Sequence, residues 1–309
     1  MYRELGKSAV AFDTVEESAV QSYIKAGKIS AEALQFGKSL IKPGVKAVDV
    51  LDKIEEKIKQ LGGGCAFPAQ VSFNDTAAHF CPDDKDSIIF EDQVVKLDVG
   101  AEINGYVTDN ALTIDLSGKW TDLVKASREA LDAVLKIAVP GTCLGEIGKT
   151  VQGVIQGYGF SPIRNLSGHG IGQFKVHTRP GIPNVDTGDT TTLQEGMTIA
   201  IEPFASTGAG MVYESGEAGV FMGVQSRPIR DLITRQVVKT VDSYRGLPFA
   251  KRWLARVFGS GKTNFALRQM LQLGVIHAYP PLVDERHGIV SQAEESVLVR
   301  EKPVFLTRI

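Results

Sequence analysis

The sequence predicts an α+β fold in which about four helices back a curved, mostly antiparallel sheet. Two observations carry this prediction. A unit of one helix followed by one strand occurs twice along the chain, and residues 94–116 (VVKLDVGAEINGYVTDNALTIDL) read as two apolar strands joined at an Asn-Gly turn. With 309 residues and 43% hydrophobic content, the chain is long and apolar enough to bury a large core.

The first helix is expected at residues 14–40, with a break near Gly27, and a second amphipathic helix at residues 121–138. Each precedes one copy of the repeated unit, which starts with Pro-Gly, continues as a helical pattern and ends at a glycine. Residues 43–62 and 140–159 are the two copies, and they have the same length. The four segments supply the predicted helices.

The inner strands repeat as well. Residues 91–98 (EDQVVKLD) align with residues 195–202 (EGMTIAIE), acid to acid and apolar to apolar. We interpret the two copies as half-sites around a pseudo-twofold axis, each with an acid at the end of its inner strand.

Two acids occupy the predicted hairpin, Asp98 in its first strand and Asp109 in its second. Burying an unpaired charge in an apolar interior costs several kcal/mol or more. Such acids are therefore expected beside a cation, and two paired strands are well placed to share one. On these two residues alone, the alternative is a strand-end aspartate and a turn aspartate.

Five residues form the candidate metal site: Asp98, Asp109, His169, Glu202 and Glu294. Four carboxylates and one imidazole are typical of a pair of divalent transition ions rather than of one tetrahedral zinc. Two ions roughly 3.5–4 Å apart can activate a bridging hydroxide and polarise a carbonyl, as in binuclear aminopeptidases. Taken singly, His169 is also compatible with a backbone-bonded loop histidine, and Glu294 with a surface charge on an edge strand.

These residues carry a resemblance to the methionine aminopeptidases of the second type, the archaeal and eukaryotic branch of the pita-bread metallopeptidases. The resemblance extends over essentially the whole chain, and its motifs are LDVG at 97–100, GHGI at 168–171, IEPF at 201–204 and QAE at 292–294. It implies a pita-bread catalytic domain with an internal pseudo-twofold repeat. It also implies two divalent ions, Co, Mn, Fe or Zn, on the five candidate ligands.

The resemblance implies a reaction too: removal of the initiator methionine from nascent proteins when the second residue is small, with a metal-bridging hydroxide as nucleophile. His79 and His177 match the substrate-facing histidines of the family. The residues that match its methionine pocket are Phe67, Val176 and Tyr279. We assign Glu202 as general base, because a metal-bound carboxylate can take the proton of the nucleophile and return it to the leaving amine.

The chain departs from the family pattern in two places. Relatives read QFEHT where residues 292–296 read QAEES, so Ala293 and Glu295 replace an aromatic residue and a histidine. Val220 stands where some relatives carry a pocket histidine. We expect these departures to change the surroundings of the metal site and the pocket, but not the reaction.

We divide the chain into a catalytic domain, residues 1–210 and 284–309, and a helical insert, residues 211–283, which the resemblance describes as winged-helix-like. Within the insert, residues 225–270 hold ten Lys or Arg and two acids. A basic helical face is typical of nucleic-acid binding, so this stretch is a candidate contact with RNA or the ribosome. The alternative is a solvated surface that shapes the rim of the active site.

The first ten residues lack a signal-peptide pattern, no apolar run is long enough to span a membrane, and the three cysteines have no disulfide framework. We therefore expect a cytoplasmic protein with no membrane contact. The resemblance implies that it acts on the N-terminal methionine of nascent peptides, and we expect a monomer.

Two other functions use the same fold. An Xaa-Pro dipeptidase or aminopeptidase P shares the five ligands but usually carries an additional N-terminal domain. A non-catalytic pita-bread protein that binds RNA or ribosomes has lost metal ligands, whereas all five are present here. Cleavage of Met-Ala-Ser against Ala-Pro peptides would separate these functions.

Overall fold

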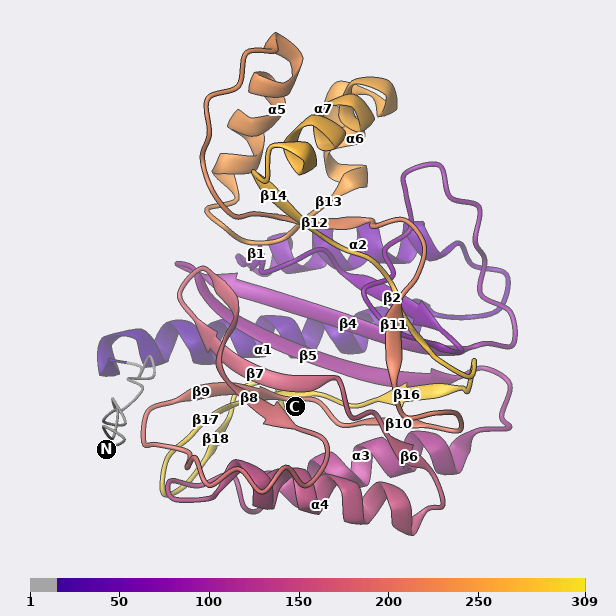
Figure 1. Cartoon of the computed structure of the whole chain (residues 1–309), viewed down its shortest axis with the longest axis vertical. Helices are drawn as coiled ribbons and strands as arrows, with labels where there is room; N and C mark the ends of the chain where they lie inside the picture. Colours follow the sequence, from indigo (N-terminus) through magenta and orange to yellow (C-terminus); the bar gives the residue numbers. More distant parts are fainter. Residues whose placement is uncertain (1–15, 309) are drawn as a thin grey trace, which may run out of the picture.

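The computed structural model describes residues 16–308, and residues 1–15 and 309 lie outside this range (Figure 1). The first ten residues, on which the expectation about a signal peptide rests, are therefore outside the described part, as are the first residues of the helix expected from Thr14. None of the described helices is long and apolar enough to cross a membrane.

Residues 16–308 contain seven helices and eighteen strands. The helices are α1 (Glu17–Leu40), α2 (Ala47–Gln60), α3 (Thr121–Leu135), α4 (Leu144–Gly157), α5 (Leu232–Ser243), α6 (Lys251–Phe258) and α7 (Ser260–Gln272). The strands of the first half are β1 (Gly64–Cys65), β2 (Gln70–Phe73), β3 (Thr76–Ala78), β4 (Val94–Ile103) and β5 (Tyr106–Asp115). Those of the second half are β6 (Ser161–Pro162), β7 (Ser167–Gly172), β8 (Lys175–Pro183), β9 (Thr198–Ile201) and β10 (Phe204–Ser206). The remainder are β11 (Val212–Glu214), β12 (Val220–Gly223), β13 (Phe249–Ala250), β14 (Ile276–Tyr279), β15 (Leu282–Asp284), β16 (Val290–Gln292), β17 (Glu295–Leu298) and β18 (Val304–Phe305).

The internal repeat is visible at the ends of α2 and α4. Each helix stops at a glycine with a left-handed backbone, Gly62 and Gly159, both at φ +82°. In each case the next amide donates back to a carbonyl five residues earlier, Gly63 to Ile58 at 3.0 Å and Phe160 to Ile155 at 3.2 Å. This hydrogen bond closes a Schellman motif, which needs the glycine. Both copies therefore end by the same local mechanism.

Helix α1 is continuous, so the predicted break near Gly27 is wrong. A Cβ atom at Gly27 would lie 2.1 Å from the carbonyl oxygen of Leu306. The glycine therefore lets the C-terminal segment pass close to the helix, and it does not interrupt the helical hydrogen bonds.

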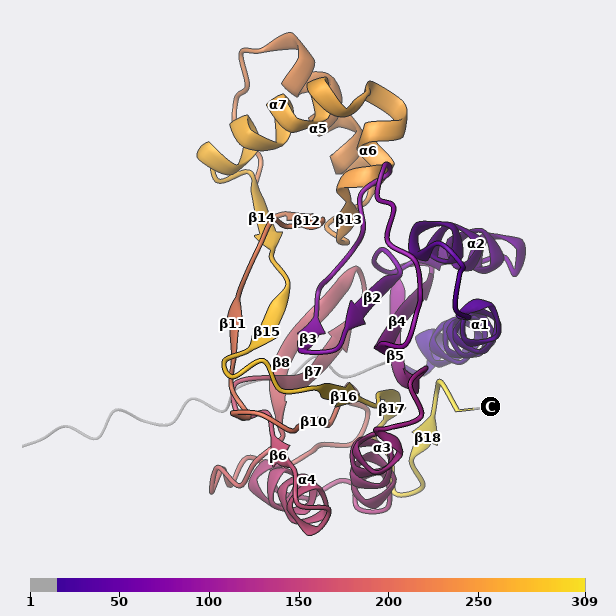
Figure 2. The same cartoon turned by 90° about the vertical axis from the view of Figure 1, so that its right-hand side faces the viewer.

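Strands β4 and β5 form the predicted hairpin, with ten antiparallel pairs from Val94↔Asp115 to Ile103↔Tyr106. Its turn residues Asn104 and Gly105 have φ of 55° and 85°, as a two-residue hairpin turn requires. Strands β1 and β2 pair with β4 on its other edge. A five-stranded sheet in the order β18-β17-β9-β7-β8 forms the second half, and α1–α2 and α3–α4 lie outside the strands (Figures 1 and 2).

The predicted sheet is antiparallel, but its hydrogen-bonded ladder is divided into five pieces in the described residues. One reason lies at β9, which ends at Ile201 just before Glu202 and Pro203, and a proline has no amide proton to donate. Isolated bridges between Ala111 and Glu294 and between Tyr106 and Gln173 connect the two halves of the molecule. Two of the interruptions, at Glu202 and at Glu294, thus fall where candidate metal ligands leave the strands.

Three helices, α5, α6 and α7, lie in the stretch predicted as a helical insert, above the other layers in Figures 1 and 2. These helices share a separate hydrophobic core with the sheet β13-β12-β14, centred on residues such as Val237, Phe249, Leu254 and Met270. Strand β11 pairs with β15, and β15 pairs with β3, so a ladder links the insert to the first half. The boundaries at residues 211 and 283 stay a prediction.

Candidate active site

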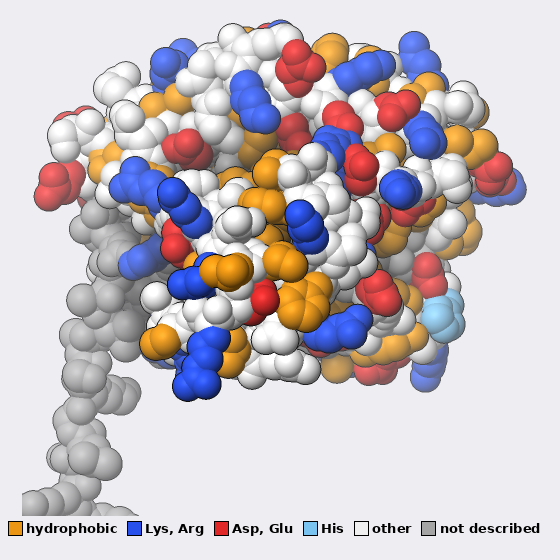
Figure 3. Space-filling model, turned by 90° about the horizontal axis from the view of Figure 1, so that it is seen from above, with side chains coloured by type: hydrophobic (Ala, Val, Ile, Leu, Met, Phe, Trp, Pro, Cys, Tyr) orange, Lys and Arg blue, Asp and Glu red, His pale blue; other side chains and the backbone are white. Residues whose placement is uncertain are grey.

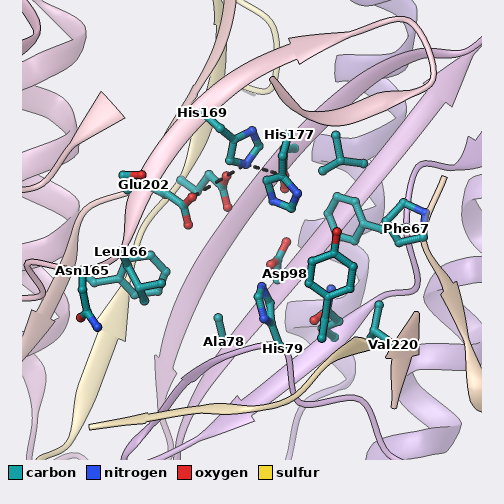
Figure 4. Close-up of a pocket in the computed structure, with 18 residues that line it drawn as sticks. Phe67, Ala78, His79, Asp98, Asn165, Leu166, His169, His177, Glu202 and Val220 are labelled. Carbon is teal, nitrogen blue, oxygen red and sulfur yellow. Dashed lines mark ion pairs between the residues drawn. The ribbon is translucent and has the colours of Figure 1, made fainter. Parts of the chain in front are cut away.

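A cavity of about 210 Å³ lies between the two halves, below the insert (Figure 4). All ten residues named from the sequence line it. They are Phe67, His79, Asp98, Asp109, His169, Val176, His177, Glu202, Tyr279 and Glu294. Side chains that are far apart in sequence therefore face one cavity.

The four carboxylates come from four different segments. Asp98 lies on β4 and Asp109 on β5, Glu202 follows β9, and Glu294 lies between β16 and β17. Asp109 and Glu294 are 4% and 3% exposed. Burial raises the pKa of each of the four carboxyls, that of Asp98 to about 7, and the repulsion of neighbouring acids adds to this in Asp109, Glu202 and Glu294.

His169 points its Nε2 at this acidic group, 3.6 Å from Asp109 Oδ2 and 3.8 Å from Glu202 Oε1. Burial and the nearby His177 lower the pKa of His169 to about 3, so the ring is neutral and these contacts are not ion pairs. Its Nδ1 lies 3.2 Å from the carbonyl oxygen of Gly170, which accepts the ring proton. The lone pair of Nε2 is thereby directed at the carboxylates, as in a metal-ligating histidine.

The donor set fits divalent cations. Ligand atoms of Asp109, His169 and Glu294 all lie within 4.8 Å of one another. Asp98 Oδ1, Asp109 Oδ1 and Glu294 Oε1 are buried, and no hydrogen-bond partner reaches them in the described structure. Buried carboxylates without partners are costly unless a cation compensates them, and oxygen-rich sets of this kind suit hard or borderline divalent ions.

Gln292 donates hydrogen bonds to two of the acids, a role that the sequence did not predict. Its Nε2 lies 3.3 Å from both Glu202 Oε2 and Glu294 Oε2. Ser296 accepts a hydrogen bond from the Asp109 amide and donates one to the Asp109 carbonyl, both at 2.8 Å. The available signal was spacing, because Gln292 is two residues before Glu294 and side chains alternate along extended chain.

Glu295 turns away from the cavity, although it replaces a histidine of the family pattern. Its carboxylate pairs with Arg128 Nη2 at 2.8 Å and with Arg308 Nε at 3.2 Å. Val220, the other departure, is buried in the cavity wall, where it pairs with Tyr279 across the β12–β14 ladder.

The rings of His79, His177 and Tyr279 lie close to one another in the cavity wall. The ring centroids of His79 and Tyr279 are 5.5 Å apart, and those of His169 and His177 are 4.3 Å apart. Burial lowers the pKa of His79 to about 4 and also lowers that of His177, so both rings are neutral at physiological pH. His79 has φ +67°, a conformation that is unusual for a residue with a side chain and that clusters at functional sites.

Comparison with known proteins gives a consistent result. Residues 21–227 match the model of metallopeptidase family M24. A methionine aminopeptidase of Thermococcus onnurineus is 42% identical over 93% of this chain and 98% of its own length. Methionine aminopeptidase 2 of Komagataella phaffii is 32% identical over 97% of this chain and 72% of its own length.

A crystal structure of methionine aminopeptidase from Thermotoga maritima superposes with a TM-score of 0.72 at 25% identity, covering 97% of this chain and all of that one. The family match extends over about two thirds of the chain, and it contains the β4–β5 hairpin, His169 and Glu202. On these grounds the chain belongs to metallopeptidase family M24, with the pita-bread fold.

Proposed function

We propose that this protein removes the N-terminal methionine of nascent polypeptides when the second residue is small. One observation carries the proposal: a buried cluster of four carboxylates and a neutral histidine shares one cavity of about 210 Å³ with an apolar wall. A cavity of this small volume suits the end of a chain rather than its middle. The methionine aminopeptidase name of the relatives agrees with this interpretation.

The ligands that would hold two divalent ions are Asp98, Asp109, His169, Glu202 and Glu294. When bound, the ions supply a water of lowered pKa as nucleophile and polarise the scissile carbonyl. Asp109 lies near the centre of the group, since it contacts His169 and influences the pKa of Glu202 as well. Its ligand atom also lies within 4.8 Å of those of His169 and Glu294.

Side chains of the protein transfer the proton of the attacking water and stabilise the negative charge that develops on the substrate carbonyl. Glu202 takes a proton from the attacking water and returns it to the amine that leaves when the amide C–N bond breaks. His79 and His177 are neutral, so each has one ring N–H to donate to the substrate carbonyl as negative charge develops on it. Phe67, Val176 and Tyr279 surround the methionine side chain.

Selection against large second residues follows from the rim. Tyr279 belongs to β14 of the insert, and it stands beside both His79 and His177. The second side chain of a substrate would pass this point, where a bulky group would displace the carbonyl. A misplacement of about 1 Å can reduce the rate about a hundredfold.

Peptides of the form Met-Gly-X, Met-Ala-X, Met-Leu-X and Ala-Pro-X, incubated with metal-reconstituted protein, test the proposal. Release of methionine from the first two, and much slower release from Met-Leu-X, is expected. Preferential cleavage of Ala-Pro-X would instead support an Xaa-Pro peptidase.

We further propose that the outer face of the insert contacts RNA near the emerging chain. Four of the ten basic residues in 225–270 already contact other residues of the chain. The guanidinium of Arg245 lies over the ring of Phe174. Lys251, Arg252 and Arg256 form ion pairs with acids of the first half. The other six are exposed and make no ion pair within residues 16–308: Arg227, Arg230, Arg235, Lys239, Lys262 and Arg268. Figure 3, which looks down on the insert, shows Lys and Arg side chains around exposed hydrophobic ones.

Charge reversal at Arg235, Lys239, Lys262 and Arg268 should weaken binding to ribosomal RNA and reduce its salt dependence, while cleavage of short peptides is retained. Reversal of Lys125, an exposed lysine on α3, is the matched control. Unchanged RNA affinity would show that the face is only a solvated surface.

We place the activity in the cytoplasm, where nascent chains emerge. We expect a monomer, because residues of one chain line the cavity. Size-exclusion chromatography with light scattering would measure the oligomeric state.

A further inference from the structure

Gln70 is a buried polar residue of the cavity that the proposed mechanism does not use. It lies on β2 directly opposite Asp98 on β4 in the antiparallel register. Side chains of directly paired residues stand side by side on the same face of a sheet, and both residues line the cavity. Gln70 is 6% exposed.

The carboxamide of Gln70 has an unused acceptor. Its Oε1 is buried with no hydrogen-bond partner in the described structure, and the same is true of Asp98 Oδ1 beside it. The contrast with Gln292 is informative, because the carboxamide of Gln292 contacts two carboxylates. Ser72, two residues further along β2, is also accounted for, since its hydroxyl accepts from the Phe80 amide at 3.4 Å. A buried polar atom that is left unpaired is costly, so Gln70 indicates a partner that enters the cavity.

The chemistry of the surroundings identifies that partner as an N–H donor. Asp98 adds a carboxylate oxygen next to Gln70, and Phe67 and His79 complete the wall around them with an aromatic ring and a neutral imidazole. A pair of adjacent acceptors suits an amino group, which carries more than one N–H. Every substrate of an aminopeptidase brings such a group at its terminus.

We propose that the Gln70 side chain accepts a hydrogen bond from the free α-amino group of the substrate, and so selects chain ends with an unmodified terminus. The inference rests on the proposed aminopeptidase function and adds a specificity-determining residue to it. Removal of the acceptor should weaken ligands that carry the amine and should spare ligands that lack it.

The test uses Gln70→Met, which keeps the length of the side chain but has no acceptor of comparable strength, in the metal-loaded full-length protein. The two probes are L-methioninol and its analogue without the amino group, and their dissociation constants are measured by calorimetry. The variant should bind methioninol about 10- to 100-fold more weakly, with affinity for the desamino analogue and metal content unchanged. The kcat/KM for Met-Ala-Ser should fall by a similar factor.

Gln70→Asn provides a second variant, because it keeps the polarity of the site but withdraws the acceptor by one methylene. It should show the same selective loss. Equal weakening of both probes, loss of bound metal, or no effect on methioninol would each overturn the proposal; loss of metal would mean that Gln70 orients Asp98 instead. Gln292→Met is the contrast, since it is expected to lose metal.

Failure of the proposed function is distinguishable from failure of this inference. If the wild-type protein did not cleave methionine peptides, the comparison of amino and desamino probes would still report whether Gln70 reads the amino group. If the wild type cleaved them and the Gln70→Met variant bound both probes as tightly as the wild type does, only the present inference would fall.

Discussion

The ring of Phe67 rests directly on Gly100: a Cβ atom at position 100 would lie 2.2 Å from Cε1 of Phe67. Gly100 lies on β4, two residues after Asp98, and faces Asp109 in the hairpin register. The glycine of the LDVG segment is thus required by a neighbouring side chain and not by a left-handed backbone. One close contact couples the strand that carries a candidate metal ligand to the apolar wall of the cavity.

Gly100→Ala should push the Phe67 ring toward the cavity and reduce the space for methionine. We expect kcat/KM for Met-Ala-Ser to fall at least about tenfold, since overpacking forces side chains from their rotamers, with little loss of metal. Gly153→Ala is the matched control, because its Cβ would meet nothing within 4 Å on α4. This control should leave activity unchanged and stabilise the helix by up to about 1 kcal/mol.

Asp109→Ala should abolish hydrolysis and lower the number of bound ions, because this residue lies at the centre of the candidate ligands. Metal content by mass spectrometry and release of methionine are the two measurements. Asp122→Ala, which removes an exposed acid of α3 whose ion-pair partner among residues 16–308 is Lys125, should change neither. Full activity in the Asp109 variant would contradict a site of two ions.

The three cavity histidines should separate by role. His169→Ala is expected to lose metal, since Nε2 of this residue faces the carboxylates. His79→Ala and His177→Ala should keep metal and lose kcat by about 10²–10³-fold, the usual value of one donor to a developing oxyanion. An equal fall in metal content in all three variants would refute this division.

Metal binding should release protons, more at pH 6 than at pH 8. Burial raises the pKa of the four carboxyls, that of Asp98 to about 7, so protons occupy them in the metal-free protein below this pH and compete with the ions. Metal affinity should therefore rise with pH. His169, with a pKa of about 3, is already neutral and contributes no proton.

Calorimetric titration of Mn²⁺ in buffers of different ionisation enthalpy would count these protons. Asp98→Asn should reduce the release. A proton count near zero at pH 6 would show that the carboxyls are ionised before metal binds.

The buried ion pair between Arg252 of α6 and Glu55 of α2 should matter for stability. Arg252 is fully buried and Glu55 is 4% exposed. Burial raises the pKa of Glu55, but its carboxylate accepts hydrogen bonds from Arg252, Trp253 and the Ala69 amide, which favour the ionised form. Arg252→Met alone should lower the free energy of unfolding by about 3–5 kcal/mol, because it strands a buried charge.

The double variant Arg252→Met with Glu55→Gln should recover part of that loss. Arg300→Met, which breaks the exposed pair with Glu17, should cost no more than about 1 kcal/mol. Urea denaturation of the three variants makes the comparison, and a single variant as stable as the wild type would show that the pair is dispensable.

Much of the site could be predicted because its acids interrupt apolar strands. Asp98, Asp109 and Glu202 stand out from sequence neighbours that are buried, and the Asn104-Gly105 turn fixes the hairpin register. Gln70 and Gln292 could not be assigned in this way, since an uncharged amide looks like a surface residue in sequence. Ser296 could not be assigned because its partner, Asp109, lies far along the chain. Gly27 was misread for the same reason: its contact, Leu306, is almost the whole length of the chain away.

The contacts between α6 and α2 also limit how the insert could be gained, lost or transplanted. Arg256 forms ion pairs with Asp52 and Asp84, and Lys251 forms one with Asp83. These add to the ion pair between Arg252 and Glu55. A deletion of the insert would leave these acids close together on the catalytic domain, with the buried Glu55 carboxylate deprived of its Arg252 partner. A viable shorter protein would need compensating neutral residues on α2 and in the loop after β3. Grafting the insert onto a foreign scaffold would require the same acids to be installed there, so the two parts are expected to diversify together.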